Sequence, residues 1–262
     1  LGTAQIASLE TADISAISTR SMAALTTSQI FAFATAQVQS LATQQVVALG
    51  VAQIAALETP QDAVALSTNS IAALLIAQVV ALTTTQAAAL TSDQVYALTT
   101  AQLVAMETAD FAAISTSSIA ALKTAQVVAL TTDEIVALTT AQTQAITSAQ
   151  AFALTTAQVQ ALETVDFASI STQSLAALKT AQVVAITTDQ AQALTSLQAQ
   201  ALTTAQVQAL ETADLAAIST SSLSQMLTAQ IAALTTVEIV ALTTAQAQAL
   251  TTAQAVALGT AQ

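Results

Sequence analysis

The sequence contains no cysteine, no histidine and no tryptophan, and it has one proline, three glycines and only 2% aromatic residues. The absence of cysteine excludes disulfide bonds and thiolate metal sites, and it leaves the redox compartment undecided. The absence of histidine removes the commonest general base and metal ligand. No glycine-rich phosphate loop or nucleophile elbow is present. We therefore predict that the protein is not an enzyme, uses no cofactor and has no catalytic residue and no small-molecule substrate.

Positive charge is equally scarce. Three basic residues, Arg20, Lys123 and Lys179, stand against 15 acidic ones, and the net charge is −12. Because phosphate binding depends on clustered lysine and arginine, nucleic acid is not expected as a partner. Apolar residues make up 54% of the 262 residues, but Thr, Ser or Gln interrupts every stretch long enough to span a bilayer. We expect no membrane insertion.

The chain consists largely of one octapeptide that is repeated in tandem. From Leu66 to Leu258 every eighth residue is Leu, Ile or Met, and a similar series runs from Leu1 to Leu57. One extra residue in the segment LETPQDAVAL shifts the frame between residues 57 and 66. We number each octad from this recurring residue, as in LTTAQVVA. The pattern predicts a single continuous array over residues 1–262.

Two further columns recur along the array. The sixth position is apolar almost throughout, with Thr143 as an exception, and the third is nearly always Thr or Ser, with Val51 and Ile76 as exceptions. A continuous helix does not fit a period of eight, since 3.6 does not divide it. The helix must be interrupted once in each octad, and a threonine N-cap supplies the interruption.

These columns predict an all-α superhelical solenoid with one helix of about six residues per octad. Each helix runs from the fourth position to the next Leu, with glutamine at the fifth position facing water or a neighbouring polar row. Pro60 fits the first helical position, where proline costs nothing. The predicted third-position N-caps are Thr59, Thr108, Thr132, Thr164, Thr188 and Thr212. The predicted core includes Leu130, Ile135, Leu138, Leu162, Phe167 and Ile170.

A β-solenoid with three octads per coil is the alternative fold. Thr and Val favour strands, whereas Ala, Leu and Gln favour helices. A β-solenoid also turns its corners largely with Gly, Asn and Asp, and glycine is almost absent here. The helical solenoid is therefore preferred.

A longer period is superimposed on the octad. Acidic units such as METADFAAIST begin near residues 9, 57, 106, 162 and 210, six or seven octads apart. Either six octads complete one superhelical turn and align these units, or a gene segment was duplicated. An aligned acidic row could bind calcium, with Glu107, Asp110, Glu163, Asp166, Glu211 and Asp214 as candidate ligands. Carboxylates at helix starts need no metal, however, and no cation-binding loop is present. We therefore predict no metal site.

Units such as LTTDEIVA at Leu130 and LTTAQVQA at Leu202 resemble the Thr-rich LTTxQ[VI]xAL tracts of very large exported bacterial proteins, which are described as adhesin-like or structural repeat proteins. The resemblance covers the whole chain and implies an extracellular or cell-surface structural role. Both ends read LGTAQ, in mid-repeat, so we expect a piece of a longer protein. The predicted function is an extended rod, tube or filament that associates with copies of itself. The alternative is an adhesin stalk or a surface-binding or ice-binding repeat module.

Overall fold

A computed structural model of the protein describes residues 1–57, 60–260 and 262. Within these residues every regular element is a helix of four to six residues, and no strand is present. One helix forms in each octad, and the helices of each unit pack on one another in regular succession. The fold is therefore a helical solenoid, as the octapeptide predicts, and the described residues do not form the alternative β-solenoid.

The chain forms two compact units, Leu1–Ala137 and Leu138–Gln262. The helices of the first unit are α1 (Thr3–Ala7), α2 (Thr11–Ala16), α3 (Thr19–Ala23), α4 (Thr27–Phe31), α5 (Thr35–Gln39), α6 (Thr43–Val47), α7 (Val51–Ala55), α8 (Pro60–Ala65), α9 (Thr68–Ala73), α10 (Ile76–Val80), α11 (Thr84–Ala89), α12 (Ser92–Ala97), α13 (Thr100–Val104), α14 (Thr108–Ala113), α15 (Thr116–Ala120), α16 (Thr124–Ala129) and α17 (Thr132–Val136). The helices of the second unit are α18 (Thr140–Ala145), α19 (Ser148–Ala153), α20 (Thr156–Ala161), α21 (Thr164–Phe167), α22 (Thr172–Ala176), α23 (Thr180–Val184), α24 (Thr188–Ala193), α25 (Ser196–Ala201), α26 (Thr204–Ala209), α27 (Thr212–Ala217), α28 (Thr220–Gln225), α29 (Thr228–Ala232), α30 (Thr236–Ala241), α31 (Thr244–Ala249) and α32 (Thr252–Ala257).

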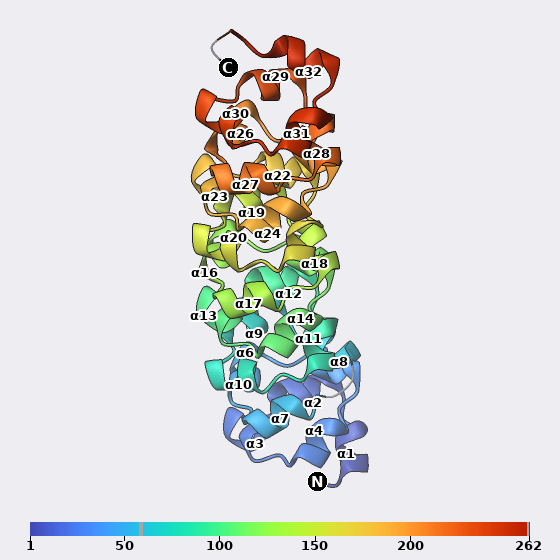
Figure 1. The fold of residues 1–262 in the computed structure, drawn as a ribbon. Coiled ribbons are helices and arrows are strands. Elements are labelled where there is room, and N and C mark those ends of the chain that lie inside the picture. The colour runs from blue at the N-terminus through green and yellow to red at the C-terminus, as the bar shows by residue number, and fades with distance from the viewer. Residues whose placement is uncertain (58–59, 261) are drawn as a thin grey trace. The chain divides into compact units, whose positions relative to one another are not determined.

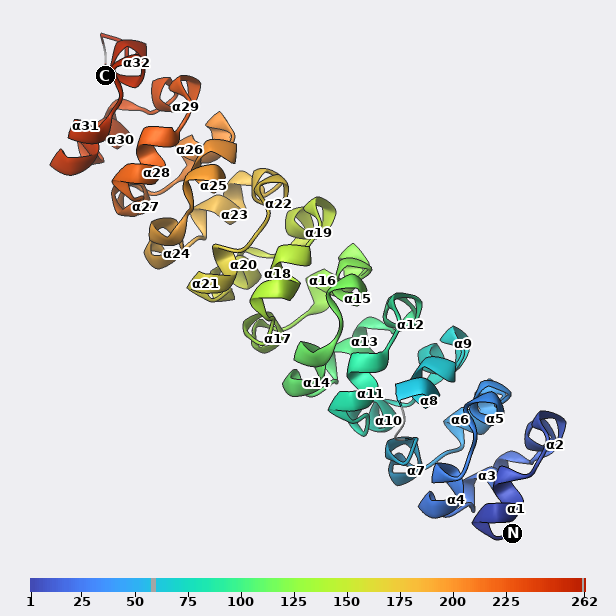
Figure 2. The same ribbon diagram turned by 90° about the vertical axis from the view of Figure 1, so that its right-hand side faces the viewer.

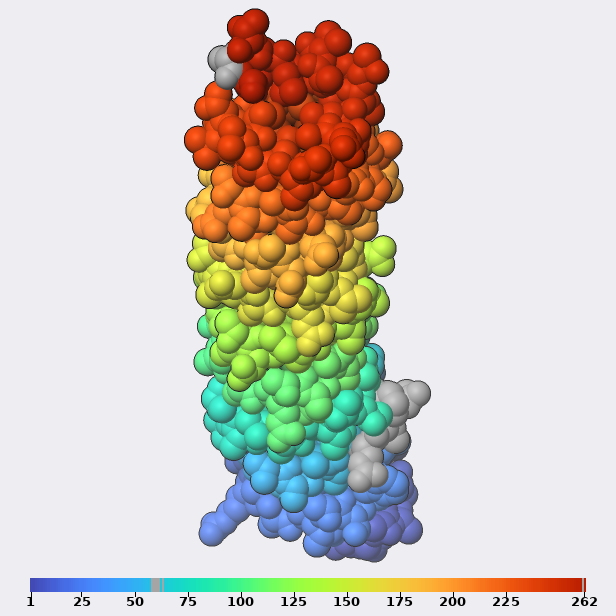
Figure 3. Space-filling model, in the orientation of Figure 1, coloured from blue at the N-terminus to red at the C-terminus, as the bar shows by residue number. Residues whose placement is uncertain are grey.

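Inside each unit a helix packs against the helix three positions later in the chain. In the first unit α8 packs on α11 and α11 on α14, and in the second α24 packs on α27 and α27 on α30. Successive helices turn around the coil, as Figures 1 and 2 show. In Figure 3 the colour bands within each unit follow one another in chain order. One coil therefore contains three octads, and the expectation of six octads per turn is wrong.

The core of each unit consists of the first and sixth residues of the octads. Leu130, Ile135, Leu138, Leu162, Phe167 and Ile170 are all buried. Phe111 and Phe167, both in sixth positions, are among the largest fully buried side chains. The polar exception Thr143 is also buried, and its hydroxyl donates to the carbonyl oxygen of Thr139 at 3.2 Å. Because a helix this short is unstable in isolation, burial between coils must stabilise it.

The helices begin at the third position of the octad, one residue earlier than predicted. The residues predicted as N-caps are instead first helical residues at Thr108, Thr132, Thr164, Thr188 and Thr212. Thr59 lies outside the described residues. The N-cap is the second position, and its side chain caps the helix in units such as that of Thr203, whose Oγ1 accepts from the N–H of Gln206 at 3.2 Å. In return Gln206 Oε1 accepts from the N–H of Thr203 at 2.8 Å. This reciprocal capping box fixes the register, because glutamine lies three residues after the cap.

Pro60 is the first residue of α8, as the sequence predicts. In other octads the first helical residue lies two positions after the octad's first residue, as Thr108 does after Met106. Pro60 lies three positions after Leu57, which agrees with the one-residue shift of the octad frame in this segment. The proline therefore marks a local exception and carries no information about the caps elsewhere.

The capping register predicts unequal effects for two adjacent threonines. Thr203→Ala removes the capping hydroxyl and should lower the free energy of unfolding by about 1 kcal/mol. Thr204→Ala changes an exposed residue in the first helical turn and should have an effect within about 0.5 kcal/mol. Urea denaturation followed by circular dichroism measures both. A larger loss at Thr204 than at Thr203 would contradict the observed register.

Candidate functional site

The glutamine at the fifth position connects successive coils. Gln126 is 2% exposed, and its Nε2 donates to the carbonyl oxygens of Val95 at 3.0 Å and Leu98 at 2.8 Å, 31 and 28 residues earlier. Its Oε1 accepts from the N–H of its own N-cap residue, Lys123, at 2.8 Å. Glutamine therefore does not face water, as the sequence had suggested it could. It lies between the coils and bonds three backbone groups at once.

The same bridge recurs through both units. Glutamines whose Nε2 reaches two carbonyl oxygens of the preceding coil in this way are Gln37, Gln45, Gln53, Gln78, Gln86, Gln102, Gln126, Gln182, Gln190, Gln198, Gln206, Gln230, Gln246 and Gln254. One accepting carbonyl of each pair belongs to the sixth residue of an octad, and it also accepts from the N–H of the residue that opens the next octad, as Val95 does from Leu98 at 3.3 Å. The other belongs to that opening residue, which lies beyond the helix end and has no intrahelical partner. The glutamine ladder thus satisfies the second carbonyl and adds a bond to the first.

Asp and Ser replace glutamine in the acidic blocks and still reach the preceding coil. Asp110 Oδ1 accepts from the hydroxyl of Thr84 at 2.7 Å, and Asp214 Oδ1 accepts from that of Thr188 at 2.9 Å. Ser118 Oγ donates to the carbonyl oxygen of Leu90 at 3.1 Å. Burial raises the pKa of Asp214, and the hydrogen bond from Thr188 partly opposes that rise. The side chain at the fifth position therefore contacts the preceding coil whether it donates or accepts the hydrogen bond.

A family model described as the ALTTAQ repeat matches residues 6–43, 22–59, 103–140, 159–196, 207–244 and 228–260, which together cover more than half of the chain. The chain belongs to the ALTTAQ repeat family. Searches of the curated proteins and of the solved structures find no match. The hexapeptide ALTTAQ itself occurs at residues 97–102, among other places. There Ala97 ends α12, Leu98 is buried and Thr99 caps α13. The next two residues are exposed, and Gln102 makes the bridge to the preceding coil.

Two carboxylates at the fifth position of the ALTTAQ array have a buried oxygen without a hydrogen-bond partner. They are Glu134 Oε1 and Asp166 Oδ1. The other oxygen of Glu134 accepts from the N–H of Thr131 at 2.7 Å and from its hydroxyl at 2.9 Å. Burial raises the pKa of Glu134, and the nearby charge of Asp133 adds to the rise, whereas the hydrogen bonds from Thr131 lower it. Glu134 therefore binds a proton more readily than an exposed glutamate does.

The candidate calcium ligands fall into two structural classes. Glu107, Glu163 and Glu211 are exposed N-cap residues whose side chains make no capping bond. Asp110, Asp166 and Asp214 are buried at the fifth position, where the carboxylates of Asp110 and Asp214 reach the preceding coil. Acidic units three octads apart stack in one column, as α14 does with α17, and are not on opposite sides as a six-octad turn would require. Among the described residues no group of three or more acidic side chains could hold a metal ion.

Two of the three cations of the ALTTAQ array lie against aromatic rings. Lys123 Nζ is 4.2 Å from the ring centroid of Tyr96, and Lys179 Nζ is 4.3 Å from that of Phe152. Both rings are about half exposed, and each lysine is an N-cap residue one coil above its ring. Such contacts stabilise the surface locally by about 0.5–1 kcal/mol. In the part of the chain that the structure describes, no helix is long and apolar enough to cross a membrane.

Proposed function

We propose that the chain is a non-enzymatic structural protein that forms an extended extracellular rod, tube or self-assembling filament. The observation that carries the proposal is the bridge between coils, made by the fifth-position residue in both units. Each coil packs on the leucines and carbonyl groups of the preceding coil. It offers leucines and carbonyl groups of the same kind to the coil that follows. Nothing in this arrangement limits the number of coils, and the buried polar side chains of the repeat serve the stacking itself.

The extracellular location rests on the resemblance to exported Thr-rich repeat tracts. Self-association rests on the regular surface and on the shortage of any other recognisable partner chemistry. Negative-stain electron microscopy at rising protein concentration tests the proposal, and it should show elongated or polymeric particles. A sample that holds only compact monomers at every concentration would reject it.

A second candidate function, an adhesin stalk or a surface-binding or ice-binding module, has one observation in its favour. In the second unit α20, α23, α26, α29 and α32 stack in one column. Each begins with an exposed threonine that does not serve as the N-cap: Thr156, Thr180, Thr204, Thr228 and Thr252. A regular row of hydroxyls is therefore available on this column. Thermal hysteresis of the purified protein would support ice binding, and its absence would reject ice binding and leave the adhesin stalk and the other surface-binding module.

A further inference from the structure

Exposed apolar side chains gather on one column of the first unit. Phe31, Val51, Leu75, Ile76 and Val80 have exposed fractions of 61%, 48%, 54%, 46% and 41%. They belong to α4 and α7, and to α10 with its N-cap residue Leu75. These three helices stack in order, α4 on α7 and α7 on α10, and lie along one edge in Figure 2. We call these five side chains the α4–α7–α10 face.

Helix geometry explains why the side chains form a row. The first and fifth helical residues are four apart and therefore lie on the same side of a helix. On α10 these residues are Ile76 and Val80, and on α7 they are Val51 and Ala55. Threonine normally occupies the first of these positions, so the two exceptions to the threonine rule coincide on adjacent coils. Contiguous apolar patches of more than a few hundred Å² mark interaction sites on soluble proteins.

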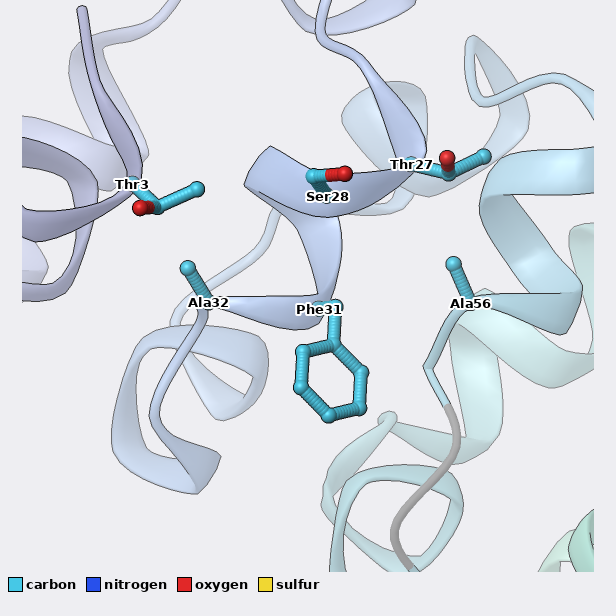
Figure 4. A pocket seen from close by; sticks show the side chains of 6 residues that line it. All are labelled: Thr3, Thr27, Ser28, Phe31, Ala32 and Ala56. Carbon is cyan, nitrogen blue, oxygen red and sulfur yellow. The ribbon is translucent and has the colours of Figure 1, made fainter.

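On this face the side chain of Phe31 projects beside an open hollow. Phe31 extends from α4 into an open hollow of about 510 Å³, which is also lined by Thr3, Thr27, Ser28, Ala32 and Ala56. Figure 4 shows the ring between Ala32 and Ala56 with no side chain of the labelled set packed against its outer part. A second aromatic ring could enter this hollow beside the first.

Charge indicates which partner this face fits. The helices α1, α4, α7, α10 and α13 contain no charged residue. Among the described residues of the first unit, the acidic ones lie on α2, α8, α12, α14 and α17 or are the N-cap residues Glu10 and Glu107. Two copies of a chain with a net charge of −12 repel each other in most orientations. The uncharged α4–α7–α10 face is where they can approach without that repulsion, and it offers no group that would select a charged partner.

We propose that the α4–α7–α10 face is a self-association surface on which two copies of this chain pack face to face. In a two-fold pairing the same patch is used twice, so Phe31 of each copy enters the hollow beside Phe31 of the other. The inference rests on the proposed function and deepens it, because it assigns the lateral contact between copies to named residues.

Sedimentation equilibrium of the full chain tests this surface. The double variant Ile76→Thr with Val80→Gln restores the residues that the repeat uses elsewhere at these positions, so the fold should be preserved. Its dissociation constant for self-association should rise at least about tenfold, since two apolar side chains leave the interface. The matched control is Val136→Gln with Val240→Gln, which removes exposed apolar side chains from α17, a helix that packs on α14, and from α30 of the second unit. The control should self-associate like the native chain.

Disulfide cross-linking gives a second readout that is independent of stability. The native chain has no cysteine, so a single introduced cysteine can pair only with the same residue of another copy. Ala52→Cys on the exposed side of α7 should form covalent dimers under mild oxidation, whereas Asn69→Cys on the exposed side of α9 should not. Efficient dimers of both variants, or of Asn69→Cys alone, would overturn the assignment.

The outcomes separate this surface from the proposed function. If the native chain associates and the α4–α7–α10 variants associate equally well, the surface is wrong while self-association stands. If the native chain remains monomeric at all concentrations, self-association and the surface both fail. Circular dichroism of each variant confirms that a lost association is not a lost fold.

Discussion

Replacing Gln206 with alanine is expected to lower the free energy of unfolding by about 3–5 kcal/mol. Gln206 is buried, and its side chain bonds three backbone groups, the N–H of Thr203 and the carbonyl oxygens of Leu175 and Leu178. Alanine leaves the N–H of Thr203 and the carbonyl oxygen of Leu178 without this partner, at about 1–3 kcal/mol for each group that water cannot reach. The carbonyl oxygen of Leu175 loses one of two bonds, because it still accepts from the N–H of Leu178 at 3.1 Å. Urea denaturation followed by circular dichroism measures the loss.

Gln192→Ala is the matched control for this prediction. Gln192 is the same residue type on α24, but it is exposed at the seventh position of its octad. Its replacement should change the free energy of unfolding by no more than about 0.5 kcal/mol. Equal effects of the two substitutions would mean that the glutamine ladder does not stabilise the stack.

The octad pattern was sufficient to predict helices, their length and the buried columns. A period of eight with aliphatic residues at the first and sixth positions leaves short helices as the consistent solution, and Leu130 and Ile135 are buried accordingly. The sequence pattern predicts the N-cap one residue too late, because threonine fills both the second and the third positions in most octads. The third is also the more regular of the two, since residues such as Lys123 and Glu107 replace threonine at the second.

The spacing from the second-position threonine to the fifth-position glutamine could have fixed the cap. Threonine followed three residues later by glutamine is the capping-box signature. Lys123 shows why the second position tolerates other residues: Gln126 still accepts from its backbone N–H at 2.8 Å, whatever the cap side chain. The same spacing places glutamine at the third helical position, with its side chain directed back to the backbone N–H of the cap.

The number of octads per coil could not be predicted from residue types. It depends on the backbone angles of the corner, such as φ −55° and ψ 138° at Leu130, which many residues can adopt. The 48-residue recurrence suggested six octads, although three helices close one coil. Asp110 and Glu134 therefore occupy stacked helices, and neither the acidic rows nor the α4–α7–α10 face could be assembled from the sequence alone.

Replacing Glu134 with glutamine is expected to stabilise the protein at neutral pH by about 1–3 kcal/mol. Glu134 occupies the fifth position, and its buried Oε1 has no hydrogen-bond partner. Glutamines at this position donate to carbonyl oxygens 31 and 28 residues earlier, as Gln126 does, and these offsets from residue 134 lead to Leu103 and Met106. A carboxylate cannot donate to a carbonyl, whereas the Nε2 of glutamine can donate to both. The variant therefore removes a buried charge and adds the missing bridge.

The gain should depend on pH with a defined sign. The pKa of Glu134 is raised by burial in the folded protein, so the folded state binds its proton more tightly than the unfolded chain does. The contribution of Glu134 to stability is therefore greatest below the pKa of an ordinary glutamate, about 4.3, and is lost as pH rises through the raised folded pKa. The difference between Glu134→Gln and the native chain should be largest at neutral pH and shrink on acidification.

Urea denaturation of both proteins at a series of pH values measures this difference directly. The matched control is Asp93→Asn, which removes a charge from an exposed residue at the start of α12 and should change the free energy of unfolding by no more than about 0.5 kcal/mol at neutral pH. If Glu134→Gln behaved like Asp93→Asn, the burial of the Glu134 carboxyl would not lower the stability of the folded state. A stabilisation that grew on acidification would have the opposite sign, and would show that the folded state favours the ionised form.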